Sequence, residues 1–325
     1  MFLDSDRTDI ILTNQPITLS TDNRQLSTNM KTITPKELPL AEFHNALLTA
    51  IAPRPICFAS TIDADGNSNL SPFSFFNIFG SNPTTLIFSP ARRVRDNTIK
   101  HTLENVMANK EVVINVVNYN MVQQMSLASC EYPKGVNEFV KAGFTPIASQ
   151  KVKPFRVKES PVQFECIVRD IIETGNEGGA GNLVIAEIVL MHIDDAVLTL
   201  DGKIDQHKMD LVGRLGSDWY VRANADSLFE VTKPNRNLGM GVDNLPEHIR
   251  LSKILTGNDL GMLANELTIP DADSVEIYKR MNKNVSEIHL RFADDAQKLQ
   301  TELHRFAQYL LNESKVSDAW KVLLG

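Results

Sequence analysis

Short runs of β-branched and aromatic residues alternate with turn signals through the central part of the chain. "PICFASTID" is followed by the turn "DADG" and then by "NSNLSPFSFF", a pattern of strand, turn and strand. "TTLIFSP" and "EVVINVVNY" predict two more strands, and "VQFECIVRDIIE" is expected to pair with "NLVIAEIVLMHID" across the loop "TGNEGGAG". From about Pro55 to Val197 the sequence therefore predicts six or more strands, largely antiparallel.

Helical spacing occurs between these strands in two places. In "NTIKHTLENVMANK", Ile99, Leu103, Val106 and Met107 form one apolar stripe, and the helix is expected to begin near Asn97. "MVQQMSLAS" predicts a second, shorter helix. Because strands dominate, the pattern favours a mainly β fold, a closed or nearly closed β barrel with peripheral helices, over a parallel α/β sheet.

The pattern becomes helical after "TKPNRN" at residues 232–237. "DNLPEHIRLSKILTGN" is expected to form one helix, with Pro246 near its first turn and Gly257 just past its end, and "DADSVEIYKRM" a second. Six apolar residues then follow at steps of four and three, a seam that needs a partner surface: Phe292, Ala296, Leu299, Leu303, Phe306 and Leu310. We predict a flexible tail over 1–29, a β domain over 30–235 and a helical extension over 236–325.

Composition places the chain among ordinary folded globular proteins. Hydrophobic residues make up 42% and charged residues 22% of the 325 positions. The net charge of −7 argues against a general nucleic-acid binder. The sequence has no long apolar run and has acidic residues near its start, so we expect a cytoplasmic protein with no membrane span. It has no C-x-x-C pair and no metal-ligand spacing, so we expect neither a disulfide framework nor a metal site.

The segment "SPARRVRDNTIKHT", residues 89–102, concentrates positive charge in an acidic chain. Its basic residues are Arg92, Arg93, Arg95, Lys100 and His101, set among the polar residues Ser89, Asn97, Thr98 and Thr102. Guanidinium and hydroxyl donors ahead of a helix N-terminus suit a phosphate dianion. A solvated loop whose charges pair with nearby acids explains the segment equally well.

The run "PFSFFNIF", residues 72–79, places four phenylalanines in eight positions. Pro72 lacks a backbone donor, so the strand there is expected to be an edge strand or to be bulged. Taken alone, the run is more typical of a buried core. Aromatic faces beside short polar side chains also suit a planar heterocycle with polar edges.

The glycine-rich loop "GNEGGAGN", residues 175–182, is not expected to bind phosphate. A strand precedes it and a strand follows it, whereas a phosphate-binding loop needs a helix N-terminus directed at the phosphate. We predict a hairpin loop.

The order of these segments resembles the flavin reductase-like family of FMN-binding split-barrel proteins, which includes flavoredoxins. The resemblance rests on "RPICFASTIDADGNSNLSPFSFFN", "NPTTLIFSP", "RRVRDNTIKHTLEN" and "EVVINVV", followed by "GVNEFVKAGFTP" and "GRLGSDWY". It covers about residues 40–235. It implies a Greek-key antiparallel split barrel that binds FMN.

The resemblance also implies which residues contact FMN. The expected cofactor-binding residues are Ser60, Thr61, Ser71, Pro72, Phe73, Ser74, Phe75, Asn77, Ser89, Arg92, Lys100 and Thr102. Of these, Arg92, Lys100 and Thr102 would hold the phosphate, and the residues up to Asn77 would line the ring and the ribityl chain. His101 stands where the family often has aspartate, and its role is open. No catalytic residue is assigned, because the flavin would carry the redox chemistry.

A substrate pocket is expected at Cys130, Tyr132, Lys134 and Glu138, a segment that approaches the open face of the flavin in the family. Cys130 is more often an inert, partly buried thiol than a redox group in such a setting. The resemblance further implies a homodimer and an oxidoreductase, either an NAD(P)H-dependent flavin reductase with NADH or NADPH as donor, or a flavoredoxin-type electron-transfer protein. The alternative is a non-enzymatic FMN carrier that docks to a redox partner through the helical extension.

Overall fold

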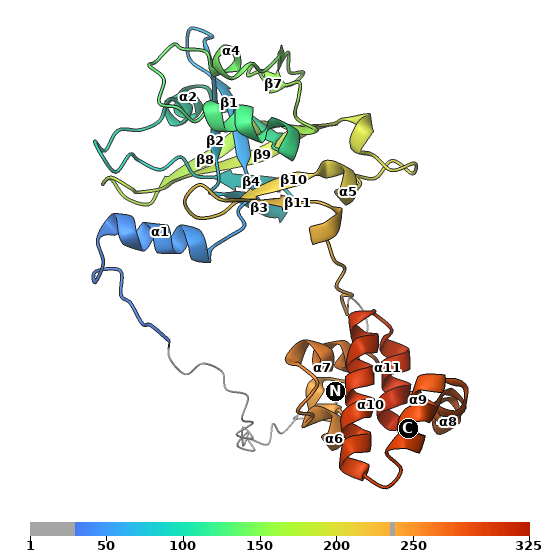
Figure 1. Cartoon of the computed structure of the whole chain (residues 1–325). Coiled ribbons are helices and arrows are strands. Elements are labelled where there is room, and N and C mark those ends of the chain that lie inside the picture. The colour runs from blue at the N-terminus through green and yellow to red at the C-terminus, as the bar shows by residue number, and fades with distance from the viewer. Residues whose placement is uncertain (1–29, 235–237) are drawn as a thin grey trace, which may run out of the picture. The chain divides into compact units, whose positions relative to one another are not determined.

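A computed structural model describes residues 30–234 and 238–325 and divides the chain into two compact units (Figure 1). One unit is Lys31–Glu230, and the other contains Val231–Gly325. The tail predicted over 1–29 lies outside the described residues. None of the helices in the described ranges is long and apolar enough to cross a membrane.

A seven-stranded antiparallel sheet organises the first unit. Its strands are β1 (Cys57–Ile62), β2 (Ser68–Phe73), β3 (Phe76–Ser81), β4 (Thr84–Phe88), β5 (Glu111–Val116), β8 (Val162–Glu173) and β9 (Asn182–Ile193). They are hydrogen-bonded in the order β2-β1-β5-β8-β9-β4-β3. The prediction of a mainly β unit with six or more antiparallel strands is confirmed, as is the β8–β9 hairpin.

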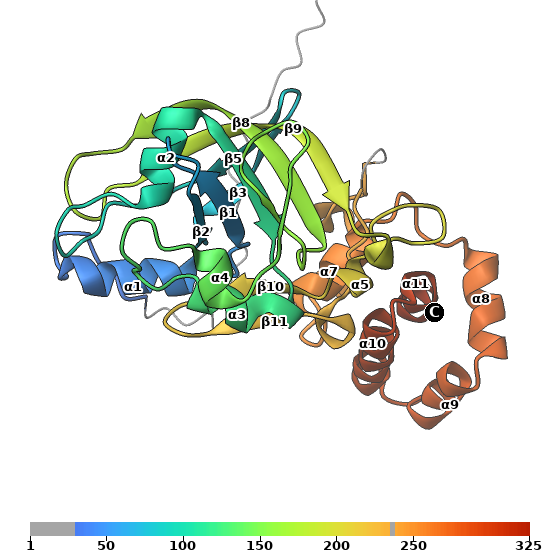
Figure 2. The same cartoon turned by 90° about the horizontal axis from the view of Figure 1, so that it is seen from above.

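The two edge strands of this sheet follow each other in the sequence. Only Ser74 and Phe75 separate the end of β2 at Phe73 from the start of β3 at Phe76. In a flat sheet of seven strands the edges would lie about 29 Å apart, whereas three residue steps reach about 11 Å at most. The sheet must therefore curl until its edges approach each other (Figure 2). Because Ser74 and Phe75 join β2 to β3, they lie at the seam of the resulting barrel.

The β1–β2 hairpin shows why its turn and its proline stand where they do. The Asp63 carboxylate accepts hydrogen bonds from the backbone N–H of Asp65 and of Asn67, at 2.9 and 2.8 Å, and so closes the predicted turn. Pro72 of β2 lies opposite Phe58 of β1. Strand β2 is an edge strand and pairs with β1 alone. The expectation that Pro72 marks an edge is confirmed.

Smaller elements complete the first unit, and helices pack against both faces of the curled sheet. They are α1 (Leu40–Ala50), α2 (His101–Asn109), η1 (Tyr119–Met121), α3 (Val122–Leu127), α4 (Glu138–Ala142), β6 (Pro146–Ile147), β7 (Arg156–Val157), η2 (Asp195–Val197), α5 (Gln206–Met209), β10 (Leu211–Arg214), β11 (Tyr220–Ala223) and η3 (Ala225–Ser227). On one face Leu103 and Val106 of α2 pack with Phe88. On the other, Phe139 of α4 packs with Phe58.

The first turn of α2 differs from the prediction. The helix begins at His101 rather than near Asn97, because Asn97 has a left-handed backbone with φ 57° and Lys100 is extended. Ile99 lies before the helix, although it still packs against the core, and Met107 is exposed. The N-terminus of α2 is thereby moved to the basic residue Lys100.

The second unit is helical. Its elements are η4 (Val242–Asn244), α6 (Glu247–Arg250), α7 (Gly257–Ala264), α8 (Ala272–Met281), α9 (Lys283–Arg291), α10 (Ala296–Asn312) and α11 (Val316–Leu324). Trp320 is buried at the centre of its core. Along the predicted seam, Leu303 and Leu310 are buried and Leu299 and Phe306 are partly buried in the same core, whereas the first two residues of the seam lie outside it.

The single helix predicted over 243–258 was wrong. It is broken into α6 and α7, and Gly257 opens α7 instead of following a helix end. Thr256 caps α7 in a reciprocal box with Asp259. The Ser252 hydroxyl accepts hydrogen bonds from the backbone N–H of Ile254 and of Leu255, which turns the chain between the two helices.

His304 of α10 makes the helical unit sensitive to acid. The ring is 4% exposed, its Nδ1 lies 2.7 Å from the Ser252 hydroxyl, and its Nε2 has no described partner. Burial, with a smaller contribution from His248, lowers the pKa of His304 to about 4. In the unfolded chain His304 has its ordinary pKa of about 6.5, so between about pH 6.5 and pH 4 it is protonated there but neutral in the folded unit. About 3 kcal/mol of the free energy of unfolding is therefore lost as the pH falls from about 6.5 to about 4.

Fluorescence of Trp320 measures this loss directly. The chain has two tryptophans, so Trp219→Phe leaves Trp320 in the helical core as the sole reporter. In that background, urea unfolding at a series of pH values is expected to show the decline for the wild-type histidine and a flatter profile for His304→Asn. Equal pH dependence in both proteins would contradict the assignment.

Candidate functional site

One face of the edge strand β2 collects several of the predicted residues. Because side chains alternate along a strand, Asn69, Ser71 and Phe73 point to the same side. The Asn69 amide donates to the Thr102 hydroxyl at 2.9 Å, and the Lys100 ammonium lies 5.0 Å from the centre of the Phe73 ring. Ser71 lies between them, so the structure brings Ser71, Phe73, Lys100 and Thr102 together.

The N-terminus of α2 meets this face with free donors. The backbone N–H groups of His101 and Thr102 have no hydrogen-bond acceptor among the described residues, and no side chain caps the helix. Lys100, which precedes them, is half-buried. Burial lowers the pKa of Lys100, and Arg93 nearby lowers it further. Helix N–H groups and a half-buried ammonium together form a corner of positive potential whose donors suit an anion.

The arginines of the basic segment have other partners. Arg93 and Arg95 form ion pairs with Glu131, at 3.2 and 2.8 Å. Arg92 donates to the side-chain oxygen of Asn97 at 2.7 Å and to its carbonyl at 3.1 Å. Of the two interpretations of the basic segment, charge pairing with nearby acids therefore applies to Arg93 and Arg95. Lys100 has no ion pair with a carboxylate in the described part of the chain.

A buried polar layer supports the corner from the barrel side. Ser60 and Thr61 of β1 are fully buried. The Thr61 hydroxyl accepts from the amides of Asn105 and Asn69, at 3.0 and 3.4 Å. The Ser60 hydroxyl has no partner among the described residues. Thr61 and Thr102 therefore share a network beneath the helix N-terminus.

The seam residues form the second part of the site. The Ser74 hydroxyl lies 3.3 Å from Nε of Arg54, which donates to it. The Phe75 ring is 39% exposed and meets the His44 ring edge to face, with the ring centres 6.1 Å apart. Asn77, on β3, is exposed, and its side-chain oxygen accepts from the backbone N–H of Ile78. The seam thus offers an accessible aromatic face beside a hydroxyl group.

The β8–β9 loop fastens the basic segment to the barrel. The buried Ser89 hydroxyl accepts from the backbone N–H of Asn182 at 3.1 Å, and the Asn97 amide donates to the Asn176 carbonyl at 2.9 Å. Gly178 approaches so closely that a Cβ there would lie 3.0 Å from the Val94 carbonyl. The glycines of this loop permit close backbone packing.

The predicted substrate-pocket residues have mixed surroundings. The sequence favoured a partly buried thiol at Cys130, but Cys130 is exposed. Lys134 pairs with Glu104 at 2.9 Å. Tyr132 is half-buried, with Lys141 over its ring. Glu138 is buried and accepts from the backbone N–H of Leu70 at 3.0 Å, which ties α4 to β2.

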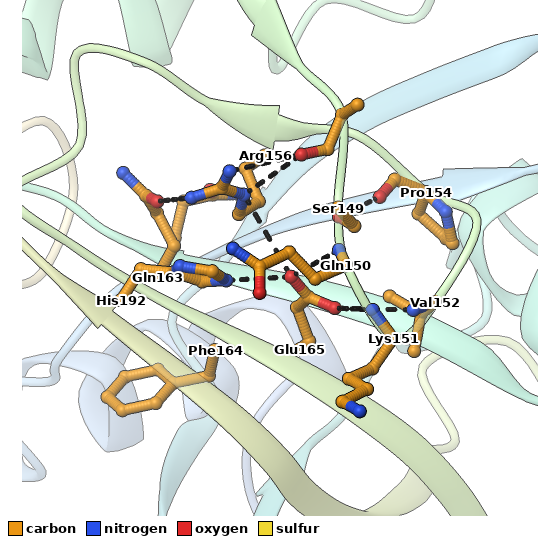
Figure 3. A network of polar contacts seen from close by, with 12 residues as sticks. Ser149, Gln150, Lys151, Val152, Pro154, Arg156, Gln163, Phe164, Glu165 and His192 are labelled. Atoms are coloured by element: carbon orange, nitrogen blue, oxygen red, sulfur yellow. Dashed lines mark hydrogen bonds and ion pairs between the residues drawn. The ribbon is translucent and has the colours of Figure 1, made fainter.

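A buried carboxylate with several hydrogen bonds lies elsewhere in the barrel, on β8 (Figure 3). Glu165 is fully buried and accepts from the backbone N–H of Gln150, Lys151 and Val152 and from His192 at 2.7 Å. Burial alone would raise the pKa of Glu165, but these donors together bring it below its ordinary value. With its acceptor positions filled, Glu165 anchors the 149–154 loop.

A groove of about 330 Å³ lies between α3 and the β10–β11 hairpin. Its two arginines are already engaged. Arg222 stacks on Tyr119 and pairs with Asp210 at 2.7 Å, and Arg214 stacks on Tyr220. The groove therefore presents little uncompensated charge.

Sequence reasoning assigned no role to Arg54, His44, Asn69 and Asn105. Arg54 carried a signal, because a lone arginine directly before the buried strand "PICFASTI" needs internal partners. Asn69 and Asn105 carried no such signal, because their hydrogen bonds to Thr61 and Thr102 form only when α2 packs against β1 and β2.

Comparison with known proteins shows the family to which the chain belongs. Residues 49–206 match the family model described as the flavin reductase like domain. An uncharacterized protein of Aquifex aeolicus is 36% identical over 196 residues, which are 60% of this chain and 97% of that protein. Another, from Halalkalibacterium halodurans, is 32% identical over 190 residues, 58% of this chain and 90% of that one.

Solved structures extend the comparison to the fold. Component B of nitrilotriacetate monooxygenase from Bacillus cereus superposes with a TM-score of 0.58 at 26% identity, over 64% of this chain and all of that one. A Shewanella frigidimarina protein described as a flavin reductase with a split barrel domain gives 0.54 at 26% identity, over 63% of this chain and 100% of that one. The split-barrel prediction for the first unit is confirmed.

Proposed function

Because the chain belongs to the flavin reductase-like family, we propose that it binds FMN and acts as an NAD(P)H-dependent oxidoreductase. The observation that carries this proposal is the half-buried Lys100 beside the free N–H groups of α2 and next to the Phe73 ring of β2. When bound, FMN would accept a hydride from NADH or NADPH and pass the two electrons to free flavin or to a redox protein. The protein would supply binding, orientation and electrostatics.

The residues present fit FMN in charge and shape. Lys100 with the N–H groups of His101 and Thr102 would hold the phosphate, and Arg92 is a further candidate. Phe75, Pro72 and Asn77 would border the flat ring, with the hydroxyls of Ser71 and Ser74 at its polar edge. Phe73 is buried in the core, so it would support the ring from beneath. Ser60, Thr61 and Ser89 are buried, so they would act from beneath by holding the backbone in place.

Anaerobic reduction tests the proposed activity. The FMN-loaded protein is titrated with NADH and, separately, with NADPH, while absorbance near the flavin visible maximum is followed. Bleaching by either nucleotide is expected. A protein that holds FMN but is bleached by neither would favour the carrier that docks to a redox partner.

We also propose that the chain forms a homodimer. Helix α1 has no buried residue, although Leu40 and Leu47 lie on it, and Phe79 of β3 and Met191 of β9 are 64% and 41% exposed. Exposed apolar side chains on a helix and on two strands of one unit support a partner surface.

Light scattering coupled to size exclusion tests the dimer. The wild type is expected to show twice the chain mass of 36.3 kDa. Phe79→Glu is expected to raise the dimer dissociation constant at least about tenfold, since it places a charge in an apolar contact. Leu290→Glu, at an exposed position of the helical unit, serves as the matched control. A monomeric wild type would refute the proposal.

A further inference from the structure

Arg54 joins three segments that meet at the barrel seam. Its guanidinium donates to the carbonyls of Leu48 and Ile51 at the end of α1, to the carbonyl of Leu215 after β10, and to the Ser74 hydroxyl. The bonds to Ile51 and Leu215 measure 2.8 and 2.9 Å. The side chain therefore fixes the position of Ser74 relative to α1 and β10.

The backbone around Arg54 is held equally firmly. Arg54 and Arg214 exchange two backbone hydrogen bonds, at 3.0 and 2.8 Å. Gly213 lies so close to Pro53 that a Cβ there would be 2.7 Å from the Pro53 side chain. This contact gives a physical reason for the first glycine of the "GRLG" motif.

The guanidinium has no counter-ion within the described residues. Arg54 is 7% exposed, and its side-chain acceptors are three carbonyls and one hydroxyl, with no carboxylate among them. Burial, with a smaller contribution from Arg214, lowers the pKa of Arg54. A buried cation without an acid is costly unless it serves another group.

The direction of the Arg54–Ser74 hydrogen bond determines what Ser74 can do. Arg54 Nε–H can only donate, so the Ser74 oxygen accepts and its own hydrogen points elsewhere. No described residue accepts that hydrogen. A hydroxyl that accepts from a cation becomes a stronger donor, because hydrogen bonds in a chain polarise one another.

We propose that Arg54 is a positioning residue that makes Ser74 a fixed hydrogen-bond donor to the flavin and so favours the electron-rich, reduced flavin over the oxidised one. The proposal rests on the proposed function, since it requires flavin to lie at the seam. Arg54 acts through Ser74 and touches no reacting atom. The cation, one hydroxyl away from the ligand, adds to the same preference.

A double-mutant cycle tests this role. Flavin affinity is measured for oxidised and for chemically reduced FMN in the wild type, Arg54→Lys, Ser74→Ala and the double variant. Lysine keeps the charge but cannot reproduce the guanidinium fork. Arg54→Lys is expected to lower the preference for reduced FMN about tenfold, equivalent to about 30 mV for a two-electron couple. In the Ser74→Ala background the same change is expected to have less than about a twofold effect.

Unfolding measurements on the same four proteins separate this role from simple scaffolding. Arg54→Lys is expected to lower stability by a similar amount with and without the Ser74 hydroxyl, because the guanidinium fork that serves the three carbonyls is lost in both backgrounds. An equal shift in flavin preference in both backgrounds, or no shift, would overturn the proposal. If Arg54→Lys does not fold, Ser74→Ala must still lose the preference and Ser74→Thr must retain it; an unchanged Ser74→Ala overturns it. If the wild type binds no flavin, the proposed function fails first, and this inference falls with it.

Discussion

Lys100→Glu is expected to weaken FMN binding about 10- to 100-fold while riboflavin binding changes less than about twofold. A hydrogen bond between charged groups contributes about 1.5–3 kcal/mol, and the reversal also places a negative charge beside the phosphate. Riboflavin lacks the phosphate, so its affinity depends on the seam and on the β2 face alone. The difference between the two ligands isolates the contribution of the corner formed by Lys100 and α2.

Fluorescence quenching of each flavin in equilibrium titrations measures the two affinities. Lys158→Glu is the matched control, because it makes the same charge change at an exposed lysine of the same unit. Its FMN affinity is expected to remain close to that of the wild type. If Lys100→Glu weakened both flavins equally, or if Lys158→Glu matched its effect on FMN, the phosphate assignment would be wrong.

Glu165→Gln is expected to destabilise the barrel unit by about 3 kcal/mol. The buried carboxylate accepts from three backbone N–H groups and from His192. An amide has one acceptor oxygen, and its NH₂ group must face some of these donors. Because the carboxylate is also held ionised by its donors, the stability it provides is lost as the pH falls through its lowered pKa.

Urea unfolding followed by circular dichroism in the β region gives the free energy of unfolding for this comparison. Glu173→Gln is the control, since Glu173 is an exposed residue at the end of the same strand. A difference of less than about 0.5 kcal/mol between the two variants would show that the Glu165 network contributes little to stability.

Local rules were sufficient to predict six of the seven strands of the large sheet, and β3 was missed because one strand was expected to run through "NSNLSPFSFF". The β1–β2 turn follows from Asp63 and its neighbours, and Pro72 correctly marks an edge because the missing donor excludes a central strand. The pairing of β8 with β9 follows from their adjacency. In each case the residues that determine the structure lie within a few positions of it.

The errors arose where a side chain bonds outside the periodic pattern. The apolar pattern across 243–258 suits one helix, but the Ser252 and Thr256 hydroxyls bind backbone N–H groups and break it in two. Asn97 has a left-handed backbone conformation, so α2 begins at His101 instead of near Asn97. Such local hydrogen bonds compete with the helix and leave no trace in its periodicity.

The site could be predicted only in part, for a related reason. The charge of Lys100 and the polar residues in the phenylalanine run are visible in the sequence. Arg93 and Arg95 share Glu131, which leaves Lys100 without an acid among the described residues. This pairing joins residues 36 to 38 positions apart, so the sequence pattern does not reveal it. The link from Arg54 to Leu215 spans 161 positions and follows only from barrel closure.

The binding of FMN to the flavin-free wild-type protein tests the central claim most directly. Calorimetric titration is expected to show one FMN per chain, bound at least about tenfold more tightly than riboflavin, as a charge-assisted phosphate site requires. Absence of FMN binding, or equal affinity for the two flavins, would contradict the account.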